Sequence, residues 1–236
     1  MPRGPQPQDP GLFGEGQHAK LREALEELAW LLSRGYVLNS SLKLVGDRHS
    51  LVGRQRVALS RAVCTDEERR ERTARQRAID TVAGQTLGID AFNLIIITES
   101  AMAGGVLIRG RDGALRDLAS VHGSYRRAEH THAAIEAIAK RLASAGVESA
   151  HWYLDRPVSN SGRLAGWIRE AGQHAGQHWE VELVDNPDQV LIEGDNPVVS
   201  SDAWIISNAP GWIDLASDII EHEVAEPWIV DLSGPA

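Results

Sequence analysis

The chain has 236 residues, and its 24 Lys and Arg against 33 Asp and Glu give a formal net charge of −9 at pH 7. A hydrophobic content of 42% and a charged content of 24% are typical of a globular protein and exclude an intrinsically disordered chain. The single cysteine, Cys64, excludes an internal disulfide framework and a multi-cysteine zinc site.

Apolar runs in the sequence are short. None approaches the ~20 residues that a helix needs to span a bilayer, so we expect no membrane partner. The polar segment Met1–Pro10 lacks the pattern of a secretory signal, and we therefore expect a cytoplasmic protein.

Charge is distributed unevenly along the chain. Residues 1–85 contain 14 basic and 11 acidic side chains, whereas residues 86–236 contain 10 and 22. The sequence pattern changes at the same point, and both changes indicate a domain boundary near residue 84. The expected organisation is a flexible tail (1–17), a basic helical domain (18–83) and an α/β domain (84–236).

Helical signals fill the first of these domains. Leucines recur at helical spacing over residues 21–32 and predict an amphipathic helix. Two shorter helices are expected around residues 41–45 and 51–63. The run Thr65-Asp66-Glu67-Glu68 is a capping box that predicts a further, Arg-rich helix.

Apolar strands alternate with helices in the second domain. The expected strands lie at 86–89, 151–154, 179–184, 197–200 and 228–230, the helices at 92–103, 131–145, 162–172 and 214–221, and a hairpin at 106–113. This alternation predicts an α/β fold with a mostly parallel sheet and flanking helices, preceded by the small all-helical domain.

Three of these strands end in an aspartate: Asp90, Asp155 and Asp202. In an open α/β sheet, sites form outside the carboxyl ends of the strands, where these carboxylates would meet. Like charges held together need a cation or shared protons, and Mg²⁺ or Mn²⁺ suits carboxylates and water. We predict that the three aspartates bind such an ion, with Asn93 and Asn160 orienting a ligand or the attacking water. The alternative is three independent helix N-caps.

The segment after the second of these strands is dense in groups that bind phosphate. Ser159, Ser161 and Arg163 lie at the start of an expected helix, whose N-terminus favours an anion. We predict that these three residues hold a substrate phosphate and that His122 and Arg126 also contact it. The alternative is a polar loop with serine caps.

Ten basic residues lie between positions 41 and 79. Arg48, Arg54, Arg56 and Arg61 surround a short connection between two expected helices, and we predict a helix-turn-helix-like contact with nucleic acid there. The alternative is a solvated, Arg-rich surface that pairs with neighbouring acids.

A zinc site is a further hypothesis. His174 and His178 stand four residues apart and Glu180 follows, a spacing that binds zinc on a helix. The glycines that flank the two histidines disfavour a helix at this point.

Several motifs resemble known families. The run Ile89-Asp90-Ala91-Phe92-Asn93, the strand ending at Asp155 and the run Ser200-Ser201-Asp202 are similar to the acidic sites of PIN-like nuclease domains. Over residues 21–221 the chain resembles an uncharacterised prokaryotic family, a domain of unknown function in which a short helical domain precedes a PIN-like domain. The motifs that carry this second resemblance are Leu44-Val45-Gly46-Asp47-Arg48 with Arg54-Gln55-Arg56, Gly110-Arg111-Asp112-Gly113 with Arg116-Asp117, His122-Gly123-Ser124-Tyr125-Arg126, and Pro157-Val158-Ser159-Asn160-Ser161-Gly162-Arg163.

The resemblance implies a Mg²⁺- or Mn²⁺-dependent ribonuclease that hydrolyses phosphodiester bonds, with RNA as its partner. One departure is that an amide, Asn208, stands where PIN-like nucleases often carry a further acid. The candidates for the missing ligand are Asp117, Asp185, Asp188 and Asp214. An incomplete site would leave a non-catalytic nucleic-acid-binding protein. A hydrolase of small phosphorylated molecules is a third hypothesis, and assembly into a homo-oligomer is left open.

Overall fold

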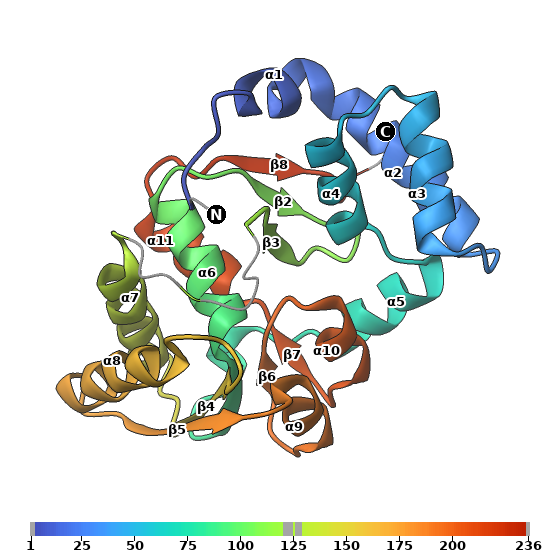
Figure 1. Ribbon diagram of the computed structural model, residues 1–236. Coiled ribbons are helices and arrows are strands. Elements are labelled where there is room, and N and C mark those ends of the chain that lie inside the picture. Colours follow the sequence, from blue (N-terminus) through green and yellow to red (C-terminus); the bar gives the residue numbers. More distant parts are fainter. Residues whose placement is uncertain (1–2, 120–124, 126–128, 235–236) are drawn as a thin grey trace.

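The computed structural model describes residues 3–119, 125 and 129–234. Helices of the amino-terminal region lie at one end of the molecule, and a parallel sheet with its own helices lies at the other (Figure 1). The amino-terminal elements are α1 (Asp9–Phe13), α2 (Glu15–Leu32), α3 (Leu38–Arg48), α4 (Gly53–Ala62), α5 (Asp66–Arg75) and a 3₁₀ turn, η1 (Ile79–Thr81). No helix in the described part of the chain is long and apolar enough to cross a membrane.

Local sequence explains the helices of this region. Leu21, Leu25 and Leu28 lie on one face of α2 and are fully buried. The capping box of α5 is confirmed, because Thr65 Oγ1 accepts a hydrogen bond from the backbone N–H of Glu68 and the Glu68 carboxylate accepts one from the N–H of Thr65. The expected helical character of the amino-terminal region is therefore confirmed.

The main sheet is five-stranded, entirely parallel and ordered β5-β4-β1-β6-β7. Its strands are β1 (Thr86–Asp90), β4 (Ser149–Asp155), β5 (His178–Val184), β6 (Val198–Val199) and β7 (Trp212–Ile213). The helices around it are α6 (Ala91–Met102), α7 (Thr131–Ser144), α8 (Ser161–His174), α9 (Pro187–Glu193), α10 (Ala203–Asn208) and α11 (Leu215–Glu223). The large core lies between one sheet face and α6, α7, α8 and α11, while α9 and α10 pack on the other face. The α/β fold with a mostly parallel sheet is thus confirmed.

A second, smaller sheet contains the predicted hairpin. Its strands are β2 (Leu107–Arg109), β3 (Leu115–Asp117) and β8 (Ile229–Asp231), with β3 antiparallel and β8 parallel to β2. Buried residues of this sheet, Ile108 and Val230 among them, form one hydrophobic cluster with Leu25 and Leu59 of the amino-terminal helices. The helical region therefore shares its core with a sheet from the carboxy-terminal part.

The amino-terminal segment expected to be a loose tail is ordered, and that expectation is wrong for the described residues from Arg3 onward. Arg3 Nε lies 2.7 Å from a buried carboxylate oxygen of Glu99. Asp9 begins α1, and Phe13 is fully buried in the cluster that contains the helix core. Prolines and glycines are frequent in this segment and are typical of a flexible tail, but partners distant in the sequence order it.

Candidate functional site

The parallel sheet has one topological switch point. From the central strand β1, the chain adds β4 and β5 on one side and β6 and β7 on the other. A crevice for a ligand forms at the carboxyl ends of the strands beside such a switch, here β1 and β6. Asp90 ends β1, and Ser200, Ser201 and Asp202 follow β6 directly.

Strand alternation decides which sheet face carries the aspartates. Trp152 and Leu154 belong to the large core, so Tyr153 and Asp155 point to the opposite face. Tyr153 packs with residues of α9 and α10 and pairs in register with Asp90. Asp90 and Asp155 therefore share the face that α9 and α10 cover.

Asp90 is buried, with 9% of its surface exposed. Its Oδ2 accepts a 2.9 Å hydrogen bond from the Ser200 hydroxyl, and its Oδ1 accepts one of 3.3 Å from the backbone N–H of Asn93, which makes Asp90 the N-cap of α6. Burial raises the pKa of Asp90 to about 7 against these two hydrogen bonds, and the charges of Asp202 and Asp188 contribute to the rise. At neutral pH, the carboxyl group is therefore close to its titration midpoint.

Asn93 and the segment after β6 hold each other in place. Asn93 Oδ1 accepts hydrogen bonds from the backbone N–H (3.0 Å) and the hydroxyl (3.2 Å) of Ser201. Asp202 caps α10 by accepting hydrogen bonds from two backbone N–H groups of its first turn, at 2.8 and 3.2 Å. Its own N–H donates to Ser200 Oγ at 3.0 Å. Asp90 and Asp202 are thus both N-caps, and the Ser200 hydroxyl links them.

A fourth aspartate approaches the same sheet face. Asp188 lies in the first turn of α9, and its pKa is raised by burial and by the charges of Asp202 and Asp155. Burial also raises the pKa of Asp155. Asp90, Asp155, Asp188 and Asp202 thus form one acidic group. Within the described residues, no Lys, Arg or His side chain pairs with any of its four carboxylates. Of the four candidates for a further ligand, Asp188 is the one that the fold brings to this group.

The four carboxylates gather without forming a tight cluster. In the part of the chain that the structure describes, no three of them have ligand oxygens all within 4.8 Å of one another. The sequence predicts a closer approach of Asp90, Asp155 and Asp202 than the structure has. One reason for the wider spacing is that the Asp202 carboxylate is engaged by the backbone of α10.

A cavity of about 480 Å³ adjoins one of these four carboxylates, Asp202. Asn93, Ser201 and Asp202 line it on the side of the parallel sheet, and Arg61 of α4 and Asp117 of β3 line it on the other side. Arg61 lies 3.5 Å from the Asp117 carboxylate and also donates hydrogen bonds to two backbone carbonyls. The cavity therefore presents both acidic and basic groups.

A buried ion-pair network supports the segment after β6. Arg116 Nε donates a 2.9 Å hydrogen bond to the carbonyl of Ser201, and its two terminal nitrogens each lie 2.8 Å from Asp112. Arg72 of α5 donates to the same Asp112 carboxylate at 2.7 Å. These residues carried no chemical role in the sequence, because only the fold brings α5, the β2–β3 turn and this segment together.

The predicted phosphate-binding residues lie at the start of α8. Asn160 has a φ of 70°, and its Nδ2 donates a 2.9 Å hydrogen bond to the carbonyl of Tyr125. The backbone N–H of Tyr125 in turn donates to the Ser159 carbonyl. Ser159 and Arg163 are exposed, whereas Ser161 is buried. The contact described for Asn160 therefore orders the loop, and its role toward a ligand stays a prediction.

The remaining predicted substrate and zinc ligands are not part of the group at the strand ends. His122 and Arg126 lie outside the described residues. His174 ends α8 and His178 begins β5, so the helical spacing on which the zinc hypothesis depended is not formed.

All four arginines predicted to contact nucleic acid are engaged within the molecule. The pairs are Arg48 with Glu27 (3.1 Å), Arg54 with Asp9 (2.6 Å), Arg56 with Asp47 (2.8 Å) and Arg61 with Asp117 (3.5 Å). The Arg54 pair is largely buried and joins α4 to α1. Each of these arginines thus pairs with a carboxylate of the same chain. Contact of these residues with nucleic acid stays a prediction.

Comparisons with known proteins match two families to separate parts of the chain. A family described as "Domain of unknown function (DUF5616)" matches residues 79–218, and one described as "Protein of unknown function (DUF434)" matches residues 20–75. "Uncharacterized protein MJ0935" of Methanocaldococcus jannaschii is 29% identical over 204 residues, which cover 86% of this chain and 97% of the relative. No solved structure matches the chain significantly.

Proposed function

We propose that this chain, which belongs to the family described as Domain of unknown function (DUF5616), is a divalent-cation-dependent phosphodiesterase of PIN-like type that cleaves RNA. One observation carries the proposal. Asp90, Asp155, Asp188 and Asp202 gather at the carboxyl ends of parallel strands, and no basic partner for them exists among the described residues.

Uncompensated carboxylates at this position suit a hydrated cation. Burial raises the pKa values of Asp90, Asp155 and Asp188, and the charge of Asp202 adds to the rise for Asp90 and Asp188. Mg²⁺ usually keeps several of its waters and needs only one or two carboxylates directly, so it does not require three ligand oxygens within 4.8 Å of one another. Asp90, Asp188 and Asp202 are the residues that would hold the ion, with Asp155 at the periphery.

The chain's own residues supply the remaining groups. When bound, Mg²⁺ or Mn²⁺ provides a Lewis acid that neutralises phosphate charge and activates water. Asp90 has a pKa raised to about 7 without an ion, and it would be ionised when it holds the cation, since a nearby positive charge lowers the pKa of a carboxyl group. Ser200 and Asn93 hold the carboxylates and the segment after β6 in position. The adjoining cavity, with Arg61 on its wall, is the space for the phosphodiester.

A cleavage assay tests the proposal. Purified protein is incubated with labelled RNA or single-stranded DNA in Mg²⁺, Mn²⁺ or EDTA, beside the variants Asp90→Asn and Asp202→Asn. We expect metal-dependent RNA cleavage that falls at least about 100-fold in both variants, since each removes a charge that holds the cation. Asp195→Asn, an exposed aspartate before β6, is the matched control and should keep full activity.

Other outcomes assign other functions. RNA binding without cleavage would support the non-catalytic binding protein instead. A hydrolase of small phosphorylated molecules is the second candidate, and the ion pairing of Arg48, Arg54 and Arg56 favours it because less positive surface remains for a nucleic-acid backbone. A parallel assay with p-nitrophenyl phosphate separates this hydrolase from the ribonuclease. If cleavage of either substrate survives Asp90→Asn, the Asp90 site is not the catalytic site.

A further inference from the structure

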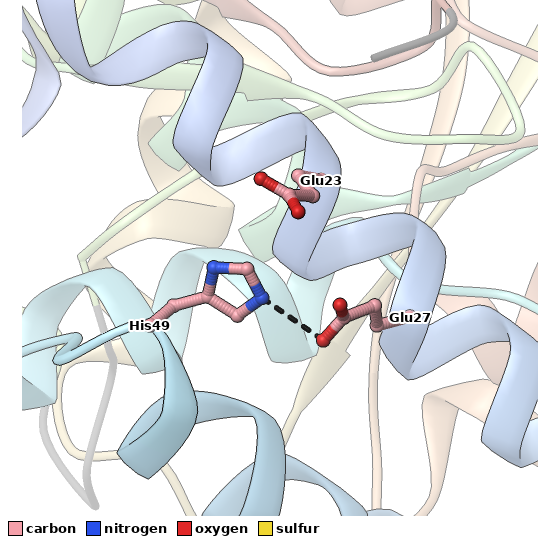
Figure 2. Close-up of side chains that lie close together, drawn as sticks. All are labelled: Glu23, Glu27 and His49. Carbon is pink, nitrogen blue, oxygen red and sulfur yellow. Dashed lines mark hydrogen bonds and ion pairs between the residues drawn. The ribbon is translucent and has the colours of Figure 1, made fainter.

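Three metal-binding side chains meet between α2 and α3, in the helical region and outside the site described above. Figure 2 shows Glu23 and Glu27, one turn apart on α2, directed toward the imidazole of His49. One ligand atom from each of the three lies within 4.8 Å of the other two. In the described part of the chain, this is the one such group of three His, Cys, Asp or Glu side chains.

The fold holds two of these donors, Glu27 and His49, in place before any ion binds. His49 is the C-cap residue of α3, and its side chain is only 9% exposed. Its Nε2 lies 2.9 Å from Glu27 Oε2. Val45, one turn earlier on α3, packs in the same hydrophobic cluster as Leu28 of α2, so the two helices cannot easily separate. Folding therefore already restricts Glu27 and His49, and the exposed Glu23 side chain is the one that would be ordered when an ion binds.

We propose that Glu23, Glu27 and His49 form a binding site for a divalent transition-metal ion of the Zn²⁺ class. Imidazole nitrogen with carboxylate oxygen suits zinc, whereas Mg²⁺ prefers oxygen donors alone. Three protein ligands leave one position of a tetrahedral ion for water. Ligand atoms about 2.1 Å from a tetrahedral ion lie roughly 3.4 Å apart, so Glu27 and His49, now 2.9 Å apart, need to separate by only about half an ångström.

A neighbouring arginine does not prevent binding. Arg48 contacts Glu27 through the other carboxylate oxygen, Oε1, at 3.1 Å, and this leaves Oε2 for the ion. The Arg48 side chain is 68% exposed and can turn toward solvent. Glu27 and Arg48 also line a groove of about 630 Å³ between α2 and α3. The bound ion would thus connect two helices at the edge of this groove.

Calorimetric titration of the untagged full-length protein with zinc sulfate tests the site, with magnesium chloride as the comparison. The variants are Glu23→Gln and His49→Gln. The matched controls are Glu15→Gln, an exposed acid of the same helix, and Asp90→Asn at the separate strand-end site. We expect Asp90→Asn, in which the strand-end carboxylates are weakened, to bind one zinc ion per chain, and the wild type and Glu15→Gln to bind at least that one. Loss of a direct ligand should weaken zinc binding by at least about 100-fold in both variants, since even outer partners contribute 10- to 100-fold.

A second readout separates loss of the site from loss of the fold. Circular dichroism should show the same helix content in all proteins without zinc. Zinc should raise the thermal midpoint of the wild type and the controls but not of Glu23→Gln or His49→Gln, because only the former bind the ion in the native state. The proposal is wrong if the wild type does not bind zinc at tens of micromolar, or if both variants bind it as the wild type does. It is also wrong if Asp90→Asn abolishes binding.

Discussion

At the scale of single residues, Asp90 is both a helix N-cap and a member of an acidic group at the strand ends, which the sequence alone left as alternatives. Its Oδ1 caps α6, as a strand-ending aspartate often does, while its Oδ2 accepts a hydrogen bond from Ser200 beside Asp188 and Asp202. An N-cap usually stabilises a helix at little cost because the carboxylate is solvated. Here the carboxylate is buried among other acids, and its ionised form is disfavoured.

Asp90→Asn should change the pH dependence of stability. The folded-state pKa of Asp90 is about 7, above its ordinary value of 3.8, so the folded protein binds this proton more tightly than the unfolded chain. The stabilisation that Asp90 contributes to the free energy of unfolding is therefore fully present below about pH 4, where Asp90 is protonated in both states. This stabilisation is lost as the pH rises through about 7. In EDTA at pH 8, the variant should be more stable than the wild type, by at most about 4 kcal/mol.

Urea denaturation of both proteins at pH 5 and pH 8 measures this effect. Asparagine caps helices as well as aspartate does, so the cap itself is conserved. The buried Asp214, whose pKa is raised to about 6, titrates in both proteins and cancels in the comparison. Addition of Mg²⁺ at pH 8 should narrow the difference by stabilising the wild type. An equal difference at both pH values would contradict the role assigned to Asp90 burial.

At the scale of elements, the β2–β3 turn is a connection between distant segments. Asp112 in this turn accepts hydrogen bonds from Arg72 of α5 and from Arg116 of β3, and Arg111 of the same turn pairs with Glu26 of α2. Burial would raise the pKa of Asp112, but the two guanidinium groups outweigh burial and hold it below its usual range. The turn thus positions Arg116, which holds the segment after β6.

Asp112→Asn should destabilise the protein strongly. The substitution leaves Arg72 and Arg116 buried without their carboxylate, and removal of one partner from a buried pair costs about 3–5 kcal/mol. Asp47→Asn is the matched control, because Asp47 contacts Lys43 and Arg56 at the surface, and the denaturation midpoint should hardly move. Equal shifts of the urea midpoint in the two variants would contradict a supporting role for the network.

At the scale of the whole molecule, the helical region and the carboxy-terminal part form a common core. Phe13 and Leu59 from the helices pack in one cluster with Ile108, Val230 and Leu232 from the region of the small sheet. The charge step near residue 84 therefore divides two sequence regions that depend on each other for burial of apolar surface.

Residues 84–236 produced alone should fail to fold as a stable monomer. The fragment would expose the face of the small sheet that the amino-terminal helices cover, and an exposed apolar surface of this kind promotes aggregation. Size-exclusion chromatography and near-ultraviolet circular dichroism of the fragment and the full chain measure this. A monomeric fragment that unfolds cooperatively would show instead that the α/β part is an autonomous domain.

Features that depend on local patterns were predictable from the sequence. Helix α2, the capping box of α5 and the hairpin turn around Asp112 follow from spacing and turn residues. The position of Asp90 and Asp155 at the ends of buried strands follows from apolar runs that stop at an acid. Each of these signals extends over only a few residues, so the chain itself contains all the information.

Features that depend on distant partners were not predictable. The segment containing Phe13 resembled a loose tail until its burial site was known. The sequence placed Arg54 in a predicted basic surface, but its guanidinium group pairs with the buried carboxylate of Asp9. Helix α9, which brings Asp188 to the strand ends, is short and begins at Pro187. Such a short helix is a weak sequence signal, and it did not distinguish Asp188 from the other candidate acids.

The sequence by itself thus determined the α/β class, the helical amino-terminal region and the aspartates that end β1 and β4, because hydrophobic periodicity and capping act locally. Only the tertiary structure decided which acids share a face, which arginines are neutralised and where Glu23, Glu27 and His49 meet. The physical reason is that charge and ligand geometry depend on distances through space. Those distances are set by packing between segments far apart in the chain, and no local pattern records them.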